Sequence, residues 1–274
     1  MSTRRTRTIV LKLGGELLER PDDVRRVASG IVALESRVPL VVVHGGGREI
    51  DAALAAGGIR KVQIDGLRVT DIPTLEVAVA VLAGTINTRL VSALRRAGGR
   101  PVGLTGADAD VATARPAAPI RTASGRRVSL GLVGTPAGHD SPRLLTTLLK
   151  DGYLPVVACI GATRRGDLLN VNADTLAQHL AVSLGAHRLV IAGSTSGVFD
   201  TAGHTIATIT SPAAARLIKR GTASAGMVAK LKACRAALRG GVADVFIVNG
   251  RLATLATLAD RSLAGGLTGT RIVA

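Results

Sequence analysis

The sequence predicts an α/β protein: a three-layer αβα sandwich around a largely parallel, open sheet, organised as two lobes. Short runs rich in β-branched residues alternate with longer helix-like segments over most of the 274 residues. The strand-like runs, such as residues 40–43, are apolar throughout, as in parallel strands buried on both faces. Several runs lead through glycines into a helix-like segment, which is the connection of a βα unit.

The first part of the chain is expected to form a β-α-β unit followed by a helix and a hairpin. Pro21 suits the first turn of a helix, and apolar residues recur after it at helical spacing. Asp65-Gly66 is a hairpin-turn pair within the alternating segment 62–69, and Asp71 is expected to cap a long helix. The expected elements are strands at 8–13 and 40–43, and helices from Pro21, from 47 to about 57, and from about 74 to 97.

The second part continues the alternation. Hairpins are expected within 111–133, with Ser124-Gly125 at one turn. Strands are expected at 101–104, 154–159, 189–192, 245–248 and 270–274. Helices are expected at 142–151, from the 170–174 junction to about 184, at 212–220 and at 227–239. No linker-like stretch divides the chain. The character of the sequence changes near residue 182, so we place a boundary between lobes 1–181 and 182–274.

Composition excludes several classes of function. A net formal charge of +16 would suit a nucleic acid, but the basic residues are mostly dispersed arginines and only Tyr153, Phe199 and Phe246 are aromatic, so we expect no nucleic-acid partner. No uninterrupted apolar run reaches the roughly 18–20 residues of a membrane span. The basic start leads into a strand rather than a signal peptide, so we expect a cytoplasmic protein without a membrane partner.

Cysteine and histidine spacing gives no metal motif. Cys159 and Cys234 are far apart in the chain and are expected to be reduced, structural thiols. The five histidines show no ligand spacing, and His44 is expected to be a packed polar residue rather than a catalyst.

Two glycine turns point to anion binding. Gly45-Gly46-Gly47 lies between a buried strand and a helix, where free backbone N–H groups can hold an anion. Lys12 precedes Gly14-Gly15 in a similar arrangement. The dinucleotide pattern Gly-x-Gly-x-x-Gly fails because Ile50 replaces its last glycine, and no Walker motif occurs. A tight turn without a ligand is the alternative interpretation.

Four further stretches carry polar groups to element ends. Arg68 lies on the expected hairpin, and Asn170-Val-Asn172-Ala-Asp174 lies at a strand-to-helix junction. Gly193-Ser-Thr-Ser-Gly197 follows a strand, and Lys230 lies one helical turn after Gly226. Each also has a structural interpretation: Lys12 could extend to solvent, Arg68 and Lys230 could be surface charges, and Asp174 could be only a helix cap.

Taken in order, these stretches resemble the amino acid kinase family, and within it the members that act on N-acetylglutamate. The resemblance runs from about Ile9 to the end and includes Ala83-Gly84-Thr85-Ile86-Asn87 and Gly269-Thr-Arg-Ile-Val. It implies ATP-dependent phosphorylation of the side-chain carboxylate of N-acetyl-L-glutamate to N-acetyl-L-glutamyl 5-phosphate, a step of arginine biosynthesis. Alternatives are a kinase for aminoadipate or glutamate linked to a carrier protein, which the basic charge would suit, and a ligand sensor without activity.

The resemblance also implies roles for individual residues. Lys12 and Lys230 would contact the transferring phosphoryl group and the leaving group, and Asp174 would hold both lysines. Residues 1–181 would form the amino-acid substrate-binding lobe and 182–274 the nucleotide-binding lobe. The implied substrate-binding residues are Gly46, Gly47, Arg68 and Asn170, and the implied nucleotide-binding residues are Gly14, Gly15, Ser194, Thr195, Ser196, Gly197, Val198, Phe199, Thr222, Ala223 and Ser224. Mg²⁺ would arrive on the ATP phosphates, with no protein ligand named.

Two positions depart from the resemblance. Ser194 stands where similar kinases commonly have aspartate, and Ala225 where an acidic or polar residue is common, which bears on nucleotide contacts. About seven residues precede the first expected strand, whereas arginine-inhibited relatives carry an extra N-terminal helix that builds a hexamer. We therefore expect a homodimer without that regulation.

Overall fold

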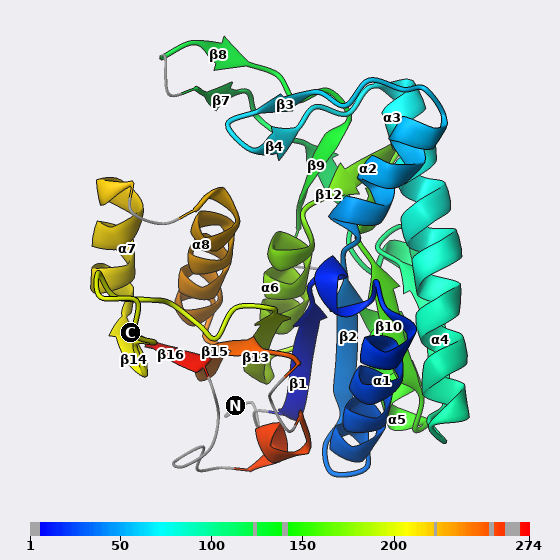
Figure 1. Cartoon of the computed structure of the whole chain (residues 1–274). Coiled ribbons are helices and arrows are strands. Elements are labelled where there is room, and N and C mark those ends of the chain that lie inside the picture. The colour runs from blue at the N-terminus through cyan, green and yellow to red at the C-terminus, as the bar shows by residue number, and fades with distance from the viewer. Residues whose placement is uncertain (1–5, 123–124, 139–141, 222–223, 252–254, 261–268) are drawn as a thin grey trace.

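The computed structural model describes residues 6–122, 125–138, 142–221, 224–251, 255–260 and 269–274. Its centre is an eight-stranded sheet in the order β14-β16-β15-β13-β1-β2-β10-β5 (Figure 1). All neighbouring strands pair in parallel except β15 and β16, which confirms the largely parallel sheet. The strands are β1 (Thr6–Leu13), β2 (Leu40–His44), β5 (Pro101–Thr105), β10 (Leu154–Ala158), β13 (Ala186–Gly193), β14 (Thr208–Thr210), β15 (Asp244–Asn249) and β16 (Gly269–Val273).

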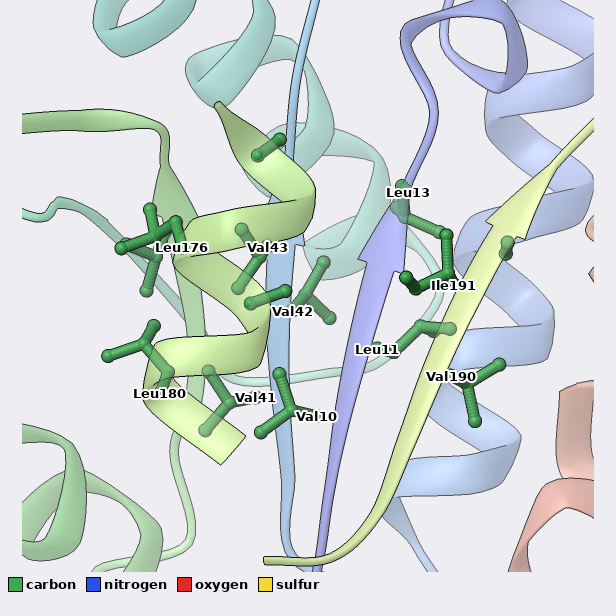
Figure 2. Close-up of a cluster of buried hydrophobic side chains, with 14 of the residues drawn as sticks. Val10, Leu11, Leu13, Val41, Val42, Val43, Leu176, Leu180, Val190 and Ile191 are labelled. Atoms are coloured by element: carbon green, nitrogen blue, oxygen red, sulfur yellow. The ribbon is translucent and has the colours of Figure 1, made fainter. Parts of the chain in front are cut away.

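The central strands are buried along their length because helices cover both faces of the sheet. Every residue of β2, β10 and β15 is buried, which explains their continuous apolar sequences. Helices α1 (Pro21–Glu35) and α4 (Asn87–Arg96) contact each other, as do α6 (Ala173–Ser183) and α8 (Ala225–Arg239). Figure 2 shows part of the core around α6, β1, β2 and β13, with Val10, Leu11, Leu13, Val41, Val42, Val43, Leu176, Leu180, Val190 and Ile191 labelled.

The remaining helices are α2 (Gly47–Ala56), α3 (Ile72–Val79), α5 (Arg143–Lys150) and α7 (Ser211–Arg220). The expected long helix after Asp71 is present as α3, a π-helical segment at Ala80–Ile86, and α4. Asp71 caps it, with its Oδ1 accepting the N–H of Thr74 at 3.0 Å.

The stretch Ile72–Arg96 is long and apolar enough, by length and composition, to cross a membrane. Its leucines at 82, 90 and 94 are buried in the core of the protein.

Short strands form smaller sheets beside the main one. The strands β6 (Ala114–Pro116), β9 (Val133–Pro136), β11 (Ile160–Ala162) and β12 (Leu168–Val171) form a four-stranded sheet in the order β11-β12-β9-β6. The pairs β3 (Gln63–Ile64) with β4 (Leu67–Arg68), and β7 (Ile120–Arg121) with β8 (Arg127–Val128), are antiparallel hairpins.

The sequence interpretation of these small sheets was only partly right. The hairpin at Asp65-Gly66 is confirmed, with positive φ angles of 48° and 77°. Ser124, expected in the β7–β8 turn, lies outside the described residues. The strand expected before the 170–174 junction is present as β12. The strands β11 and β14 were not anticipated, because three residues are too few to establish a period of two.

Candidate active site

Two glycine turns meet at the carboxyl edge of the sheet, where β1 and β2 end side by side. A Cβ atom added to Gly15 would lie only 3.0 Å from the Cα of Gly46. The N–H of Gly45 donates to the carbonyl oxygen of Leu13 at 3.3 Å, which ties the second turn to the end of β1. The absence of a side chain at Gly15 therefore allows the two turns to pack backbone against backbone.

A buried ion pair lies beside these turns. Lys12 Nζ, near the end of β1, is 2.8 Å from Asp174 Oδ1, and the two residues are 6% and 5% exposed. Burial alone lowers the pKa of Lys12, but the charge and hydrogen bond of Asp174, together with the nearby charge of Glu16, outweigh it, so this pKa lies above its ordinary value. Lys12 is therefore a fixed positive charge at the sheet edge, and the alternative that it extends to solvent is wrong.

The start of α6 places Asp174 in this pair. Asn172 is the N-cap, and its Oδ1 accepts the N–H groups of Asp174 at 3.0 Å and Thr175 at 3.1 Å. The alternative that Asp174 serves only as a cap is therefore wrong. Because Asn172 caps the helix, the Asp174 carboxylate is left to face Lys12 from the first helical turn, where negative charge is stabilised.

Arg68 reaches from β4 to the second glycine turn. Its Nη2 donates to the carbonyl oxygen of Gly47 at 3.0 Å and to Asp51 Oδ1 at 2.5 Å. The side chain is 12% exposed, so the interpretation as a surface charge is wrong. Its Nη1 is buried with no hydrogen-bond partner.

Asn170 lies on β12, and its Nδ2 donates to Thr70 Oγ1 at 3.2 Å, which links it to the segment after the hairpin.

Lys230, on α8, lies beside the end of β13, the strand next to β1. Its Nζ donates to the carbonyl oxygen of Gly226 at 3.5 Å, and its Cε lies 3.8 Å from where a Cβ of Gly193 would be. Among the described residues, Asp174 forms its ion pair with Lys12 rather than with Lys230. The structure thus brings Lys12 and Asp174 together, while a shared contact with Lys230 stays a prediction.

The expected nucleotide segment begins where β13 ends. Val198 donates its N–H to Thr270 Oγ1 at 2.8 Å, Asn249 Nδ2 donates to Ser196 Oγ at 3.3 Å, and Phe199 is 47% exposed. Ser224 caps α8 by accepting the N–H of Met227. Gly14 donates its N–H to the carbonyl oxygen of Ala192, at the end of β13. Thr222 and Ala223 lie outside the described residues.

Two acidic residues near the site were missed by the sequence interpretation. Glu16 Oε1 accepts the N–H of Ser194 at 3.1 Å, so its carboxylate lies between the ends of β1 and β13. The signal was its position directly after Gly14-Gly15. Asp51 lies one turn into α2 from Gly47, and only the fold shows that Arg68 reaches it. Among the described residues, no group of three His, Cys, Asp or Glu side chains is placed to hold a metal ion.

His44 is a packed polar residue, as expected. It is fully buried, its Nδ1 is 3.2 Å from the carbonyl oxygen of Gly45, and its Nε2 is 3.0 Å from Asn87 Nδ2. Asn87 is a donor, so Nδ1 must carry the proton of a neutral ring. Burial lowers the pKa of His44 to about 4.

Comparison with known proteins identifies the family of this chain. A model of the amino acid kinase family matches residues 7–249. An acetylglutamate kinase of Erythrobacter litoralis is 39% identical over 251 residues, which cover 90% of this chain and 84% of the relative. An acetylglutamate kinase of Rhizorhabdus wittichii is 40% identical over 273 residues, which cover 96% of this chain and 89% of the relative.

Solved structures show the same fold. N-acetylglutamate synthase from Neisseria gonorrhoeae, complexed with coenzyme A and N-acetyl-glutamate, superposes with a TM-score of 0.81 at 28% identity. The match covers 99% of this chain and 60% of the synthase chain. Carbamate kinase from Giardia lamblia bound to AMP-PNP shares the fold at a TM-score of 0.69 and 18% identity, over 98% of each chain. From the family match and these relatives, the chain belongs to the amino acid kinase family.

Proposed function

We propose that this protein transfers the γ-phosphoryl group of ATP to the side-chain carboxylate of N-acetyl-L-glutamate, giving N-acetyl-L-glutamyl 5-phosphate for arginine biosynthesis. The observation that carries the proposal is the buried Lys12–Asp174 pair beside two touching glycine turns. The names of relatives that are about 40% identical over most of the chain support the choice of substrate.

The proposed reaction needs positioning more than a strong base. The attacking carboxylate is already ionised at neutral pH, so it has no proton to lose. In the proposal, Lys12 stabilises charge on the transferring group and Asp174 keeps the ammonium in place. The backbone N–H groups of Gly46 and Gly47 bind the reacting carboxylate or the phosphoryl oxygens. Arg68 and Asn170 bind the rest of the substrate, with Arg68 on the α-carboxylate.

The nucleotide would lie over the ends of β1 and β13. In this proposal, residues 1–181 bind the amino-acid substrate and residues 182–274 bind ATP. The ATP contacts are Gly14, Gly15, the segment from Ser194 to Phe199, and Thr222 to Ser224. Lys230 would leave its contact with Gly226 to reach the leaving phosphate. That movement is supported by the exposure of this side chain, which is intermediate rather than buried.

The site residues fit a Mg²⁺ ion carried on the ATP phosphates. Glu16 places a partly exposed carboxylate beside the strand ends, and Mg²⁺ is typically held by one or two carboxylates together with substrate phosphates. When bound, the ion would neutralise phosphate charge. Within this arrangement Glu16 would have to exchange its bond from Ser194 for one to the ion.

The proposal includes a cytoplasmic homodimer. The exposed apolar side chains Val62, Leu67 and Ile72, the last 67% exposed, lie close together in sequence and provide apolar surface for a second copy. Light scattering is expected to give twice the 27.9 kDa mass of the chain. A monomer or a hexamer would contradict the dimer.

The test of function is release of ADP with N-acetyl-L-glutamate, glutamate, aspartate and N-acetylaspartate as alternative substrates. We expect turnover with N-acetyl-L-glutamate and little with the other three. A second arm uses aminoadipate linked to an acidic carrier protein, a substrate that the net charge of +16 would attract. Preference for the carrier-linked substrate, or no turnover with any of these, would overturn the proposal.

A further inference from the structure

Asp51 is the meeting point of two positive charges from the β3–β4 hairpin. Its Oδ2 lies 2.7 Å from Lys61 Nζ, which comes from the segment entering the hairpin. Its Oδ1 lies 2.5 Å from Arg68 Nη2, which comes from β4. Asp51 itself lies on α2, the helix that begins at Gly47. One carboxylate on α2 therefore contacts both the segment that enters the hairpin and the second strand of the hairpin.

In this arrangement one terminal nitrogen of the Arg68 guanidinium is held by hydrogen bonds and the other has no acceptor. Nη2 is shared between Asp51 and the carbonyl oxygen of Gly47, whereas Nη1 is buried and has no partner. A buried donor without a partner is costly unless a ligand supplies an acceptor. Because the guanidinium is planar, holding Nη2 from two sides also sets the direction in which Nη1 donates.

We propose that Asp51 is a positioning residue for substrate recognition: it holds Arg68 so that Nη1 is directed at the α-carboxylate of the amino-acid substrate. The proposal rests on the function proposed above, and it adds a residue that does not itself touch the substrate. The selectivity of the site for a carboxylate over a neutral group at this position depends on Asp51.

The charge of Asp51 alone would have the opposite effect. A carboxylate close to an anion-binding arginine repels the incoming anion, so long-range electrostatics predicts that removing Asp51 strengthens binding. Lys61 counters that repulsion, since it is paired with the same carboxylate. Burial raises the pKa of Asp51, but the hydrogen bonds and positive charges of Lys61 and Arg68 together outweigh it and hold the pKa below its ordinary value. The carboxylate is thus ionised and already compensated, which leaves orientation as its main effect.

A purely structural role of Asp51 predicts a different experimental result. The hairpin exposes Val62 and Leu67, at 44% and 39%, so little apolar burial fastens it. If Asp51 only fastened the hairpin, its loss would lower stability and weaken charged and neutral ligands alike. A positioning role weakens only the ligand that presents a carboxylate to Arg68.

The experiment is isothermal titration of two ligands into the full chain: N-acetyl-L-glutamate, and its α-carboxamide, which keeps the side-chain carboxylate. Asp51→Asn should bind N-acetyl-L-glutamate about 10- to 100-fold more weakly, the range expected for loss of a hydrogen bond between charged groups. Its affinity for the α-carboxamide should change by less than about twofold, as for sites that do not interact. Lys61→Met is the matched control, since it removes the second positive charge that pairs with Asp51 but leaves the contact between Asp51 and Arg68. This variant should keep the preference for the ligand with the α-carboxylate.

Other results separate the explanations. Tighter binding of N-acetyl-L-glutamate by Asp51→Asn, with weaker binding by Lys61→Met, would show that net charge decides and would overturn the proposal. Equal losses for both ligands would reduce Asp51 to a structural anchor. If Asp51→Asn does not fold, Asp51→Glu keeps the charge but displaces the carboxylate, and an unchanged preference in that variant would also overturn it.

The outcome for the proposed function is distinguishable. Wild-type protein that binds and phosphorylates N-acetyl-L-glutamate, with an unchanged preference in Asp51→Asn, overturns only the role of Asp51. Wild-type protein that binds neither ligand overturns both proposals.

Discussion

Lys12 and Asp174 form a buried ion pair, with Nζ 2.8 Å from Oδ1, that joins the end of β1 to the first turn of α6. The pair connects the edge of the main sheet to α6, and the strand that directly precedes α6 in the chain, β12, belongs to the four-stranded sheet. It thus links the two parts of the fold at the place where the glycine turns meet. The predictions below test what this pair and its neighbours do.

The first prediction concerns catalysis by the lysines. Lys12→Met and Lys230→Met should each lower kcat by about 10²–10³, because charge develops at the phosphoryl group mainly in the transition state. The double variant should be much less than multiplicatively worse, since the two lysines would act as a unit. Steady-state kinetics, with circular dichroism to establish folding, is the measurement. A Lys230→Met variant with wild-type kcat and altered ATP affinity only would make that lysine a nucleotide-binding residue.

A second prediction concerns the stability of the pair. Asp174→Asn should destabilise the protein by about 3–5 kcal/mol, because it leaves the buried Lys12 without its counter-charge. The double variant Lys12→Met with Asp174→Asn should recover much of that loss, since no uncompensated charge remains. Urea denaturation of the two single variants and the double variant measures the coupling. Strictly additive losses would mean that the pair contributes no coupling energy.

Substrate recognition by Arg68 is tested by a charge-conserving change. Arg68→Lys should raise the KM for N-acetyl-L-glutamate strongly while leaving the KM for ATP near the wild-type value. The planar guanidinium of Arg68 can donate to Asp51, to the carbonyl oxygen of Gly47 and to a substrate carboxylate at the same time. The compact ammonium group of a lysine lacks this fixed arrangement of donors. An unchanged KM for N-acetyl-L-glutamate would remove Arg68 from the substrate site.

The glycine turn allows a comparison of two neighbours. A Cβ at Gly46 would lie 2.1 Å from Ile86 Cδ1 and 3.1 Å from Leu82 Cδ2, so Gly46→Ala should destabilise the protein by about 1–3 kcal/mol through overpacking. A Cβ at Gly47 would meet nothing within 4 Å, so Gly47→Ala should keep the wild-type melting temperature. If Gly47 lies against the substrate, as proposed, this variant should nevertheless lose activity. Full activity in folded Gly47→Ala would argue against that contact.

The pH dependence of stability should reflect His44. The unfolded chain takes up a proton at His44 near pH 6.5, whereas the folded state resists protonation until about pH 4. Stability from this group is therefore present above about pH 6.5 and falls as the pH drops towards 4, by an amount on the order of 3 kcal/mol. Denaturant unfolding of wild-type protein and His44→Gln across this range measures it. The variant should have a shallower slope, and identical slopes would contradict the assignment to His44.

The sequence by itself determined the α/β class, the order of the main strands and helices, and the importance of the residues at strand ends. Continuous β-branched runs and helical spacing are local properties, so they can be recognised without knowing the fold. The glycine turns and the Asn170–Asp174 junction were identified for the same reason, because strand, turn and helix start follow one another in the chain.

Tertiary structure decided which of these ends meet. The ion pair of Lys12 with Asp174, the contact of Gly15 with Gly46, and the reach of Arg68 to Asp51 all join residues distant in sequence. No local pattern specifies such contacts, because they follow from the order of strands in the sheet and from the way α6 packs on it. Asp51 was missed for this reason: its local setting is unremarkable, and only the fold brings Arg68 within hydrogen-bonding distance of it. Glu16 directly follows the Gly14-Gly15 turn, but its contact with Ser194 likewise depends on the fold.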